Sequence, residues 1–390
     1  MPYICRARSR AASSAGRALL WHSRGQGFKS LAVHMSFKQH TWALVLSCAA
    51  VIILVVSVNG LHDMRVDGPI YTAQVESFTH GTIFSGTPAE LVRLFKPLYP
   101  IVASTVFWFL TPANALLFMN CLFLLLLGFS SRSLLRQLNC NEAESTIGAI
   151  WVIAGYPILK YGLSISTDIG GIALATTAVA YGLRGVREKN LWAIVAASLI
   201  GTCGALAKET GALGLLFVGL TILSEARTLG YKQTFMQLAA LCIPFAIVEG
   251  SFLALIYNKA PNFLDWYGNN VNQYAAGYHT LTYFVLTNGS TFNLLWLFAC
   301  AGVAWLLITK QIERRNLTAL VLLFFSAAPV LLWPIFISRI LFIQFWWVIP
   351  LALFGLRFVA NKSKYLALAA LPVISSIVLF LVSGGGALHR

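Results

Sequence analysis

Long apolar runs, separated by short segments that carry charges or turn-forming residues, dominate this chain. The runs contain 16–23 residues, which is about the length of α-helix that crosses a hydrocarbon core of ~30 Å. Lipid cannot satisfy exposed backbone polar groups, so continuous apolar runs form helices there. The pattern predicts an all-α, polytopic membrane helix bundle of about eleven transmembrane spans, at residues 41–59, 113–131, 144–162, 168–184, 191–206, 210–225, 235–257, 291–309, 317–337, 340–358 and 365–383.

One further apolar segment, residues 99–112, has 14 residues between prolines and is too short for an ordinary span. If it does not cross, every second loop is basic, and all basic loops share the side of the basic N-terminus. These loops contain Arg132 and Arg136; Arg184, Arg187 and Lys189; Arg227 and Lys232; Lys310, Arg314 and Arg315; and Arg357, Lys362 and Lys364. Basic loops mark the cytoplasmic side. We therefore expect in-plane helices in the first outside loop.

The composition agrees with a membrane protein. The chain is 58% hydrophobic and 11% charged, with a mean hydropathy of +0.75, against roughly 25% charged residues in soluble domains. We attribute the net charge of +15 to the anionic membrane surface and expect no nucleic-acid partner. The seven cysteines are scattered without a CxxC pair, so the sequence predicts neither a disulfide framework nor a cysteine metal site.

The chain divides into a basic tail, residues 1–40, and a membrane domain, residues 41–390. The tail holds seven Lys or Arg residues and no acid. Such a start resembles a transit peptide, and Met35 is an alternative start site. The alternation of spans assigns residues 60–112 to a first outside loop and residues 258–290 to a second one.

Ionisable residues in this apolar chain are candidates for chemistry, because charge is costly in lipid. Asp67 in "RVDGPIYTAQVESF" is either the N-cap of a short helix or a catalytic acid. Lys96 in "RLFKPLYP" is either an interfacial lysine or a phosphate contact. Asp168 in "SISTDIGG" is likewise either part of a helix N-cap or a second outside carboxylate with a role in catalysis.

Four other features fall in or between spans. Lys208 and Glu209 interrupt an apolar stretch and either form a hairpin tip or face a polar cavity. Arg339 in "FISRILF" is a lone outside cation suited to phosphate. Glu249 lies in the middle of a span. The second outside loop is rich in aromatic residues, which either stack on sugar rings or form an interface belt. Further candidates for substrate binding are Tyr71, Asp265, Trp266, Tyr267 and His279.

In this order, the motifs resemble those of the GT-C glycosyltransferases. They are the "D-x-x-x-Y" of Asp67–Tyr71, the "KPLYP" that begins at Lys96, the "TD" that ends at Asp168 and the "KE" of Lys208–Glu209. The resemblance covers roughly residues 41–225 and is nearest to the protein O-mannosyltransferase and lipid A aminoarabinose transferase branch. It implies the GT-C fold and transfer of a sugar, with inversion, from a polyprenyl-phosphate carrier to an acceptor on the extracytoplasmic side.

The resemblance also implies roles for individual residues. Asp67 matches an aspartate that activates or orients the acceptor, and Asp168 matches the second-loop aspartate. Lys96 and Arg339 match residues that face the carrier phosphate. Relatives often carry Glu where Gly68 stands, so a divalent metal remains an open question. The "KPLYP" stretch has Leu98 where relatives often carry a second proline.

The implied partners are a polyprenyl-phosphate-linked sugar donor, membrane lipids, and a glycan, lipid or protein acceptor. A multi-pass protein of a bacterial inner membrane is the expected setting. Two other readings stay open: a transporter or flippase of lipid-linked sugars, and an inactive GT-C homologue. Transporters usually carry ionisable residues at the bilayer midplane, whereas most candidates here fall at the outside ends of spans.

Overall fold

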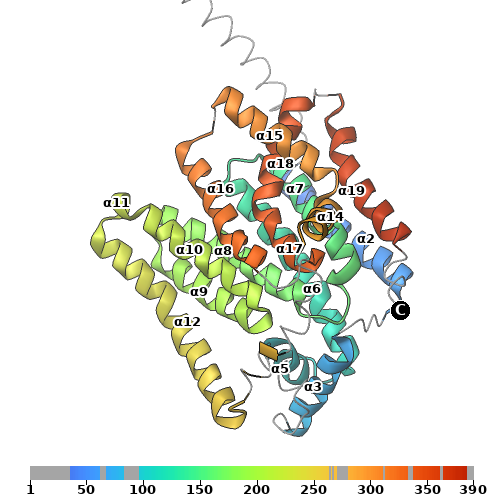
Figure 1. Cartoon of the computed structure of the whole chain (residues 1–390), viewed down its shortest axis with the longest axis vertical. Helices are drawn as coiled ribbons and strands as arrows, with labels where there is room; N and C mark the ends of the chain where they lie inside the picture. The colour runs from blue at the N-terminus through green and yellow to red at the C-terminus, as the bar shows by residue number, and fades with distance from the viewer. Residues whose placement is uncertain are drawn as a thin grey trace, which may run out of the picture.

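The structure is a computed structural model of the chain, and it describes residues 36–61, 67–82, 96–262, 265, 268–269, 280–310, 312–332, 337–360 and 363–383. Within these residues the fold is a bundle of helices (Figure 1). The longer helices are α2 (Phe37–Asn59), α3 (Gly68–His80), α5 (Leu98–Thr105), α6 (Pro112–Gln137), α7 (Glu142–Ile153), α8 (Asp168–Glu188), α9 (Leu191–Ala207), α10 (Ala212–Ser224), α12 (Tyr231–Lys259), α14 (Leu281–Phe292), α15 (Leu295–Thr309), α16 (Arg314–Ala327), α18 (Phe345–Val359) and α19 (Tyr365–Val382). The short turns are η1 (Ile158–Gly162), η2 (Glu209–Gly211), α11 (Ala226–Leu229), η3 (Ala328–Leu332), α17 (Ser338–Leu341) and η4 (Phe342–Gln344).

Each of the eleven predicted spans overlaps at least one helix among the described residues, but not every helix is long enough to span a bilayer alone. Among the described residues, seven helices are long and apolar enough, or eight if the pair α14 and α15 counts as one span. Helices α9 and α10 are apolar but shorter, and α7 ends at Ile153 before the π-helical turn η1. The predicted span at 291–309 corresponds to α15, and the chain bends by 91° between α14 and α15 at the beginning of this span.

Helices α8 and α18 form the centre of the bundle. Of the apolar window in each helix, 83% of α8 and 89% of the α17–α18 segment is buried, against 11% for α12. Helices α15 and α18 pack backbone to backbone, because a Cβ on Gly355 would lie 1.8 Å from the carbonyl oxygen of Phe298. The exposed apolar side chains of α2, α12 and α19 are those that contact lipid in a membrane protein.

Helices α3 and α5, which belong to the predicted first outside loop, form a small layer at one end of the bundle. Figure 1 places α3 and α5 together there, beneath the longer helices. Tyr71 and Val75 of α3 pack with Tyr99 and Ala103 of α5 against the first turns of α6. With eight residues, α5 covers only about 12 Å at 1.5 Å per residue. It is too short to cross a bilayer, in agreement with the in-plane helices expected in this loop.

Candidate active site

Six charged side chains from five separate segments meet beside the start of α8. We call them the charge cluster: Asp67, Lys96, Asp168, Lys208, Glu209 and Arg339. The exposed fraction of these side chains is small, from 6% for Asp67 to 21% for Arg339. Their three positive and three negative charges balance, which limits the cost of burying them. Every member was a sequence candidate, and the structure brings all six together.

Asp168 lies at the centre of the cluster. Its Oδ1 is 3.0 Å from Nζ of Lys208, and its Oδ2 is 3.1 Å from Nη1 of Arg339. The same Nη1 is 3.6 Å from Oδ2 of Asp67, which is an ion pair but too long for a hydrogen bond. Arg339 therefore lies between two aspartates and holds Asp168 more tightly than Asp67.

Lys96 and Glu209 form the other half of the cluster, with Nζ 3.0 Å from Oε1. Glu209 follows Lys208 directly, so the two ion pairs are joined through one backbone turn. This is the turn that the sequence predicts between α9 and α10. It is very tight, because a Cβ on Gly211 would lie 2.0 Å from the carbonyl carbon of Gly204.

Two glycines after Asp168 explain how the cluster closes. A Cβ on Gly171 would lie 2.3 Å from Cβ of Lys208, and a Cβ on Gly170 would lie 2.3 Å from the hydroxyl oxygen of Tyr99. Real Cβ atoms do not approach so closely, so only glycine allows Lys208 and Tyr99 to reach the first turn of α8. The motif "DIGG" thus supplies both the acid and the space for its partner.

Tyr99 and Asn120 support the segment that precedes Asp168. The Tyr99 hydroxyl donates to Oδ1 of Asn120 at 2.9 Å, and Nδ2 of Asn120 donates to the carbonyl oxygen of Ser164 at 2.7 Å. Burial raises the pKa of Tyr99 well above its usual range, so the hydroxyl stays protonated. Sequence reasoning missed this pair; the signal was an amide in the middle of an apolar run.

The alternative reading of the two aspartate motifs, helix capping, is wrong for the side chains concerned. Asp67 occupies the N-cap position of α3 and Thr167 that of α8, but neither side chain makes a capping hydrogen bond. The Thr167 hydroxyl instead lies 3.3 Å from the hydroxyl of Tyr71. Tyr71 therefore joins the site, as expected, through the segment that carries Asp168.

The remaining candidates are not members of the charge cluster. Asp265 is exposed. Trp266, Tyr267 and His279 lie outside the described residues. Glu249 lies on α12, a helix that supplies no member of the charge cluster. Within the predicted second outside loop, residues 281–290 are helical, because α14 begins at Leu281.

The described residues do not fit a divalent metal. Among them, no three His, Cys, Asp or Glu side chains come together as metal ligands. Asp67 and Asp168 share a partner, but that partner is the guanidinium of Arg339, and Asp168 also holds Lys208. A hard divalent cation requires several free oxygen ligands and would here meet cations already in contact with the carboxylates.

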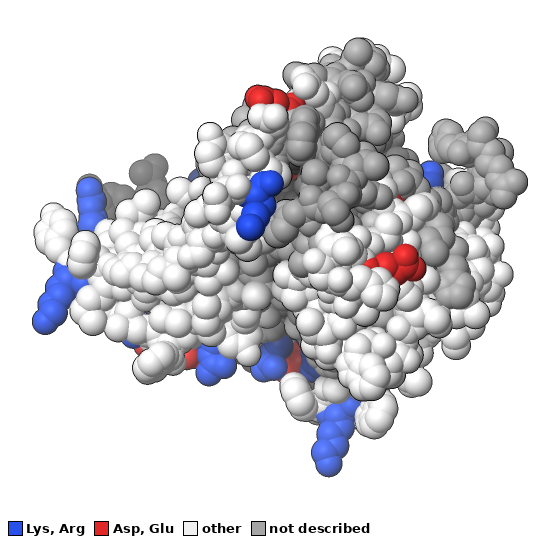
Figure 2. Space-filling model, turned by 90° about the horizontal axis from the view of Figure 1, so that it is seen from below, with Lys and Arg blue, Asp and Glu red and all other residues white. Residues whose placement is uncertain are grey.

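The cluster is buried charge and not a surface patch. Figure 2 views the molecule from the α3 and α5 side, where uncharged surface predominates and Lys, Arg, Asp and Glu side chains are scattered. Buried charges keep a strong interaction, since water and salt screen them poorly. The arrangement can therefore hold or redistribute negative charge on a bound group at this end of the bundle.

Solved structures of the Archaeoglobus fulgidus oligosaccharyltransferase have a similar fold. The apo form aligns with a TM-score of 0.63 at 12% identity, covering 90% of this chain and 56% of that one. A form tethered by a disulfide to an acceptor peptide with the NVT sequon gives 0.60 at 13% identity, covering 90% and 55%. The complex with Zn and sulfate gives 0.56 at 14%, covering 88% and 53%.

No protein family model matches this sequence, and no curated protein matches it. The chain spans little more than half the length of the oligosaccharyltransferase it resembles. At 12–14% identity the likeness establishes the fold: this chain has the GT-C fold. Its long apolar helices make it a multi-pass membrane protein. The narrower O-mannosyltransferase or aminoarabinose transferase assignment stays a prediction.

Proposed function

We propose that this protein is an integral membrane glycosyltransferase that moves a sugar from a polyprenyl-phosphate carrier to an acceptor, with inversion, on the extracytoplasmic side. The observation that carries the proposal is the charge cluster, three buried acids and three buried bases at one end of a GT-C bundle. A fold alone does not imply an activity, so the argument rests on what these six groups do.

In the proposed reaction, an acceptor hydroxyl oxygen attacks the anomeric carbon of the donor sugar. The bond between that carbon and the carrier phosphate oxygen breaks, and its electron pair leaves on the phosphate. The hydroxyl proton passes to a carboxylate that acts as general base. Attack opposite the leaving group inverts the configuration at the anomeric carbon.

Lys96, Lys208 and Arg339 are the groups assigned to the departing phosphate. Preorganised cations in a site shielded from water stabilise developing negative charge more strongly than they do in water. In the structure each of these cations contacts a carboxylate at 3.0 to 3.1 Å. The acids therefore hold the cations in place, and phosphate oxygens would share them when the donor binds.

Asp67 is the candidate base. Its contact with Arg339 is 3.6 Å, longer than the two contacts that hold Asp168. Asp168 is thus better suited to position Lys208 and Arg339 than to accept a proton. Asp67 is also the N-cap residue of α3, in the loop through which an acceptor would approach.

The position of the cluster supports an enzyme over a transporter. Transporter sites usually lie near the bilayer midplane on broken helices. Asp168 is the first residue of α8, and Arg339 is the second residue of α17, so the charges lie where spans begin. Glu249, the acid in mid-span, lies on α12 and is not a member of the charge cluster.

The test uses purified full-length protein and a panel of radiolabelled polyprenyl-phosphate sugars, with membrane extract as the source of acceptor. The wild type should transfer label from one donor. Asp67→Asn should reduce the rate of transfer by about 100-fold or more, which is the usual contribution of a general base to the rate. The matched control is Glu76→Gln, since Glu76 is an exposed acid on the same helix and should keep full activity.

Two results would reject the proposal. Movement of the labelled lipid across liposome membranes without any transfer would identify a flippase. An inactive homologue would bind the donor but show neither sugar transfer nor movement of the lipid across liposome membranes. Its affinity for the donor would be the same in Asp67→Asn. A normal melting temperature for Asp67→Asn in detergent is the check that lost transfer is not lost folding.

A further inference from the structure

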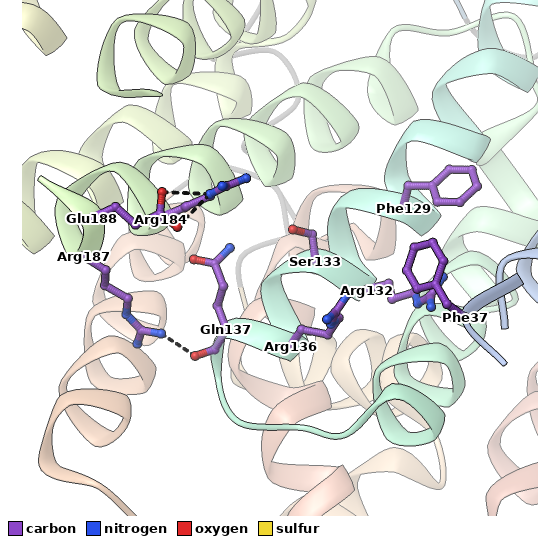
Figure 3. Close-up of a pocket in the computed structure, with 9 residues that line it drawn as sticks. All are labelled: Phe37, Phe129, Arg132, Ser133, Arg136, Gln137, Arg184, Arg187 and Glu188. Atoms are coloured by element: carbon purple, nitrogen blue, oxygen red, sulfur yellow. Dashed lines mark hydrogen bonds and ion pairs between the residues drawn. The ribbon is translucent and has the colours of Figure 1, made fainter. Parts of the chain in front are cut away.

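A cavity of about 470 Å³ opens at the other end of α8. Four arginines line it: Arg132 and Arg136 on α6, and Arg184 and Arg187 on α8. Figure 3 shows these side chains on the facing helices α6 and α8, with Phe37 and Phe129 at one side. The size lies within the range of ~300–1,000 Å³ that is usual for ligand sites.

The cavity keeps a net positive charge after its ion pairs are counted. Arg132 and Arg136 share the carboxylate of Glu142, at 2.7 and 2.9 Å. Arg184 pairs with Glu188 at 3.0 Å, while Arg187 donates to neutral groups, the carbonyl of Gln137 and Oδ1 of Asn316. Four arginines thus face two glutamates, which leaves a net charge of +2.

Two of the arginines are available to a ligand. The Arg136 and Arg184 side chains are 50% and 65% exposed. Each guanidinium carries five N–H donors; the ion pair of Arg184 uses its Nε, and that of Arg136 uses its Nη2. A planar guanidinium with free terminal donors matches the oxygens of a phosphate.

The cavity lies at a membrane interface. Asp168 and Glu188 begin and end α8, whose 21 residues extend about 30 Å at 1.5 Å per residue. That length equals the hydrocarbon core of a bilayer, so the cavity lies one bilayer away from the charge cluster. Phe37 and Phe129, 62% and 38% exposed, give it an apolar edge, with Arg132 4.9 Å from the Phe37 ring centre.

We propose that this cavity binds the phosphate headgroup of an anionic phospholipid. The arginines contact the phosphate, and the acyl chains lie along the apolar surface that begins at Phe37 and Phe129. Basic pockets between transmembrane helices on the cytoplasmic side are suited to anionic headgroups. A free phosphate ion would use the arginines but gain nothing from the aromatic edge, so the combination favours a lipid.

The inference is tested on the purified full-length protein, stripped of lipid in a non-ionic detergent. Phosphatidylglycerol with a fluorescent tail is the probe, and its dissociation constant is measured in mixed micelles. Unlabelled phosphatidylglycerol should compete, whereas phosphatidylcholine and inorganic phosphate at the same concentration should not. The double variant Arg136→Gln/Arg184→Gln should bind the probe about tenfold or more weakly, as expected for lost hydrogen bonds to a charged group.

The matched control is Arg227→Gln/Arg314→Gln, which removes two exposed arginines at the same end but outside the cavity and should bind normally. A second variant, Ser133→Trp, fills the cavity from its exposed lining residue while all four arginines remain, and it should also lose binding. Equal weakening in both double variants would indicate general charge attraction and overturn the proposal. So would competition by inorganic phosphate as strong as that by lipid, or unchanged binding in Ser133→Trp.

Discussion

Buried ion pairs lie at both ends of the bundle, but the pairs are built differently. At the end away from the charge cluster, where the start of α7 meets the last turn of α18, Glu144 is buried and pairs with Arg357 through both of its oxygens. The same carboxylate accepts a hydrogen bond from the backbone of Asn141 at 2.8 Å, which completes a capping box at the start of α7. Glu144 therefore completes the cap of α7 and joins the start of α7 to the last turn of α18.

In the charge cluster, Asp67 stands at the N-cap position of α3, but its side chain does not cap that helix. Asp168, in the first turn of α8, instead holds two cations from distant segments, Lys208 and Arg339. Charged groups that do not secure helix ends are the ones to assign to chemistry, because their burial is costly and local structure does not explain it.

The largest expected effect would come from breaking the structural pair at the far end. Glu144→Ala leaves the guanidinium of Arg357 without its partner and removes the capping box. A broken buried pair costs about 3–5 kcal/mol of unfolding free energy, and the lost cap adds about 1 kcal/mol. A denaturing-detergent titration followed by circular dichroism should measure this loss.

The matched comparison is Asp67→Asn at the other end of the bundle. This variant should change the unfolding free energy little, although it strongly lowers the rate of sugar transfer. The double variant Glu144→Leu/Arg357→Leu should recover part of the loss, because an apolar pair replaces a broken ionic one. A Glu144→Ala protein as stable as wild type would remove the distinction between the two ends.

The sequence predicts the bundle because apolar runs of membrane length form helices regardless of their neighbours. It does not predict the 91° bend between α14 and α15. The chain bends at Asn293, whose φ is +37°, and a single residue of this kind does not change the hydrophobic periodicity of the sequence. The members of the charge cluster were identifiable one by one, since ionisable residues are rare in an apolar chain.

Their pairing was not identifiable from the sequence. Lys96 meets Glu209, and Asp168 meets Arg339 171 positions away; only the tertiary fold determines such partners. Tyr99 and Asn120 escaped notice for a related reason, because neither carries a charge, and their role is to position the segment before Asp168.

A substitution of intermediate effect tests how the cluster is closed. Gly171→Ala places a Cβ 2.3 Å from Cβ of Lys208, so α8 and the Lys208 turn must separate. Overpacking of this kind costs about 1–3 kcal/mol, and displacing Lys208 from Asp168 should also lower sugar transfer. Gly250→Ala is the control, since its Cβ meets nothing within 4 Å and alanine favours helix by about 1 kcal/mol. Equal activity in both variants would mean that the Lys208–Asp168 contact is dispensable.

The smallest effect on stability is expected at the exposed pair of Arg184 and Glu188, one turn apart on α8. Their side chains are 65% and 49% exposed, and such pairs contribute about 0.3–0.5 kcal/mol. The acid also lies at the C-terminal end of the helix, where negative charge is unfavourable. Glu188→Gln should therefore leave the unfolding free energy nearly unchanged while it raises the net charge of the arginine cavity. Tighter binding of fluorescent phosphatidylglycerol at unchanged stability would show that the charge of this cavity affects lipid binding and not folding. Weaker binding would contradict the lipid assignment.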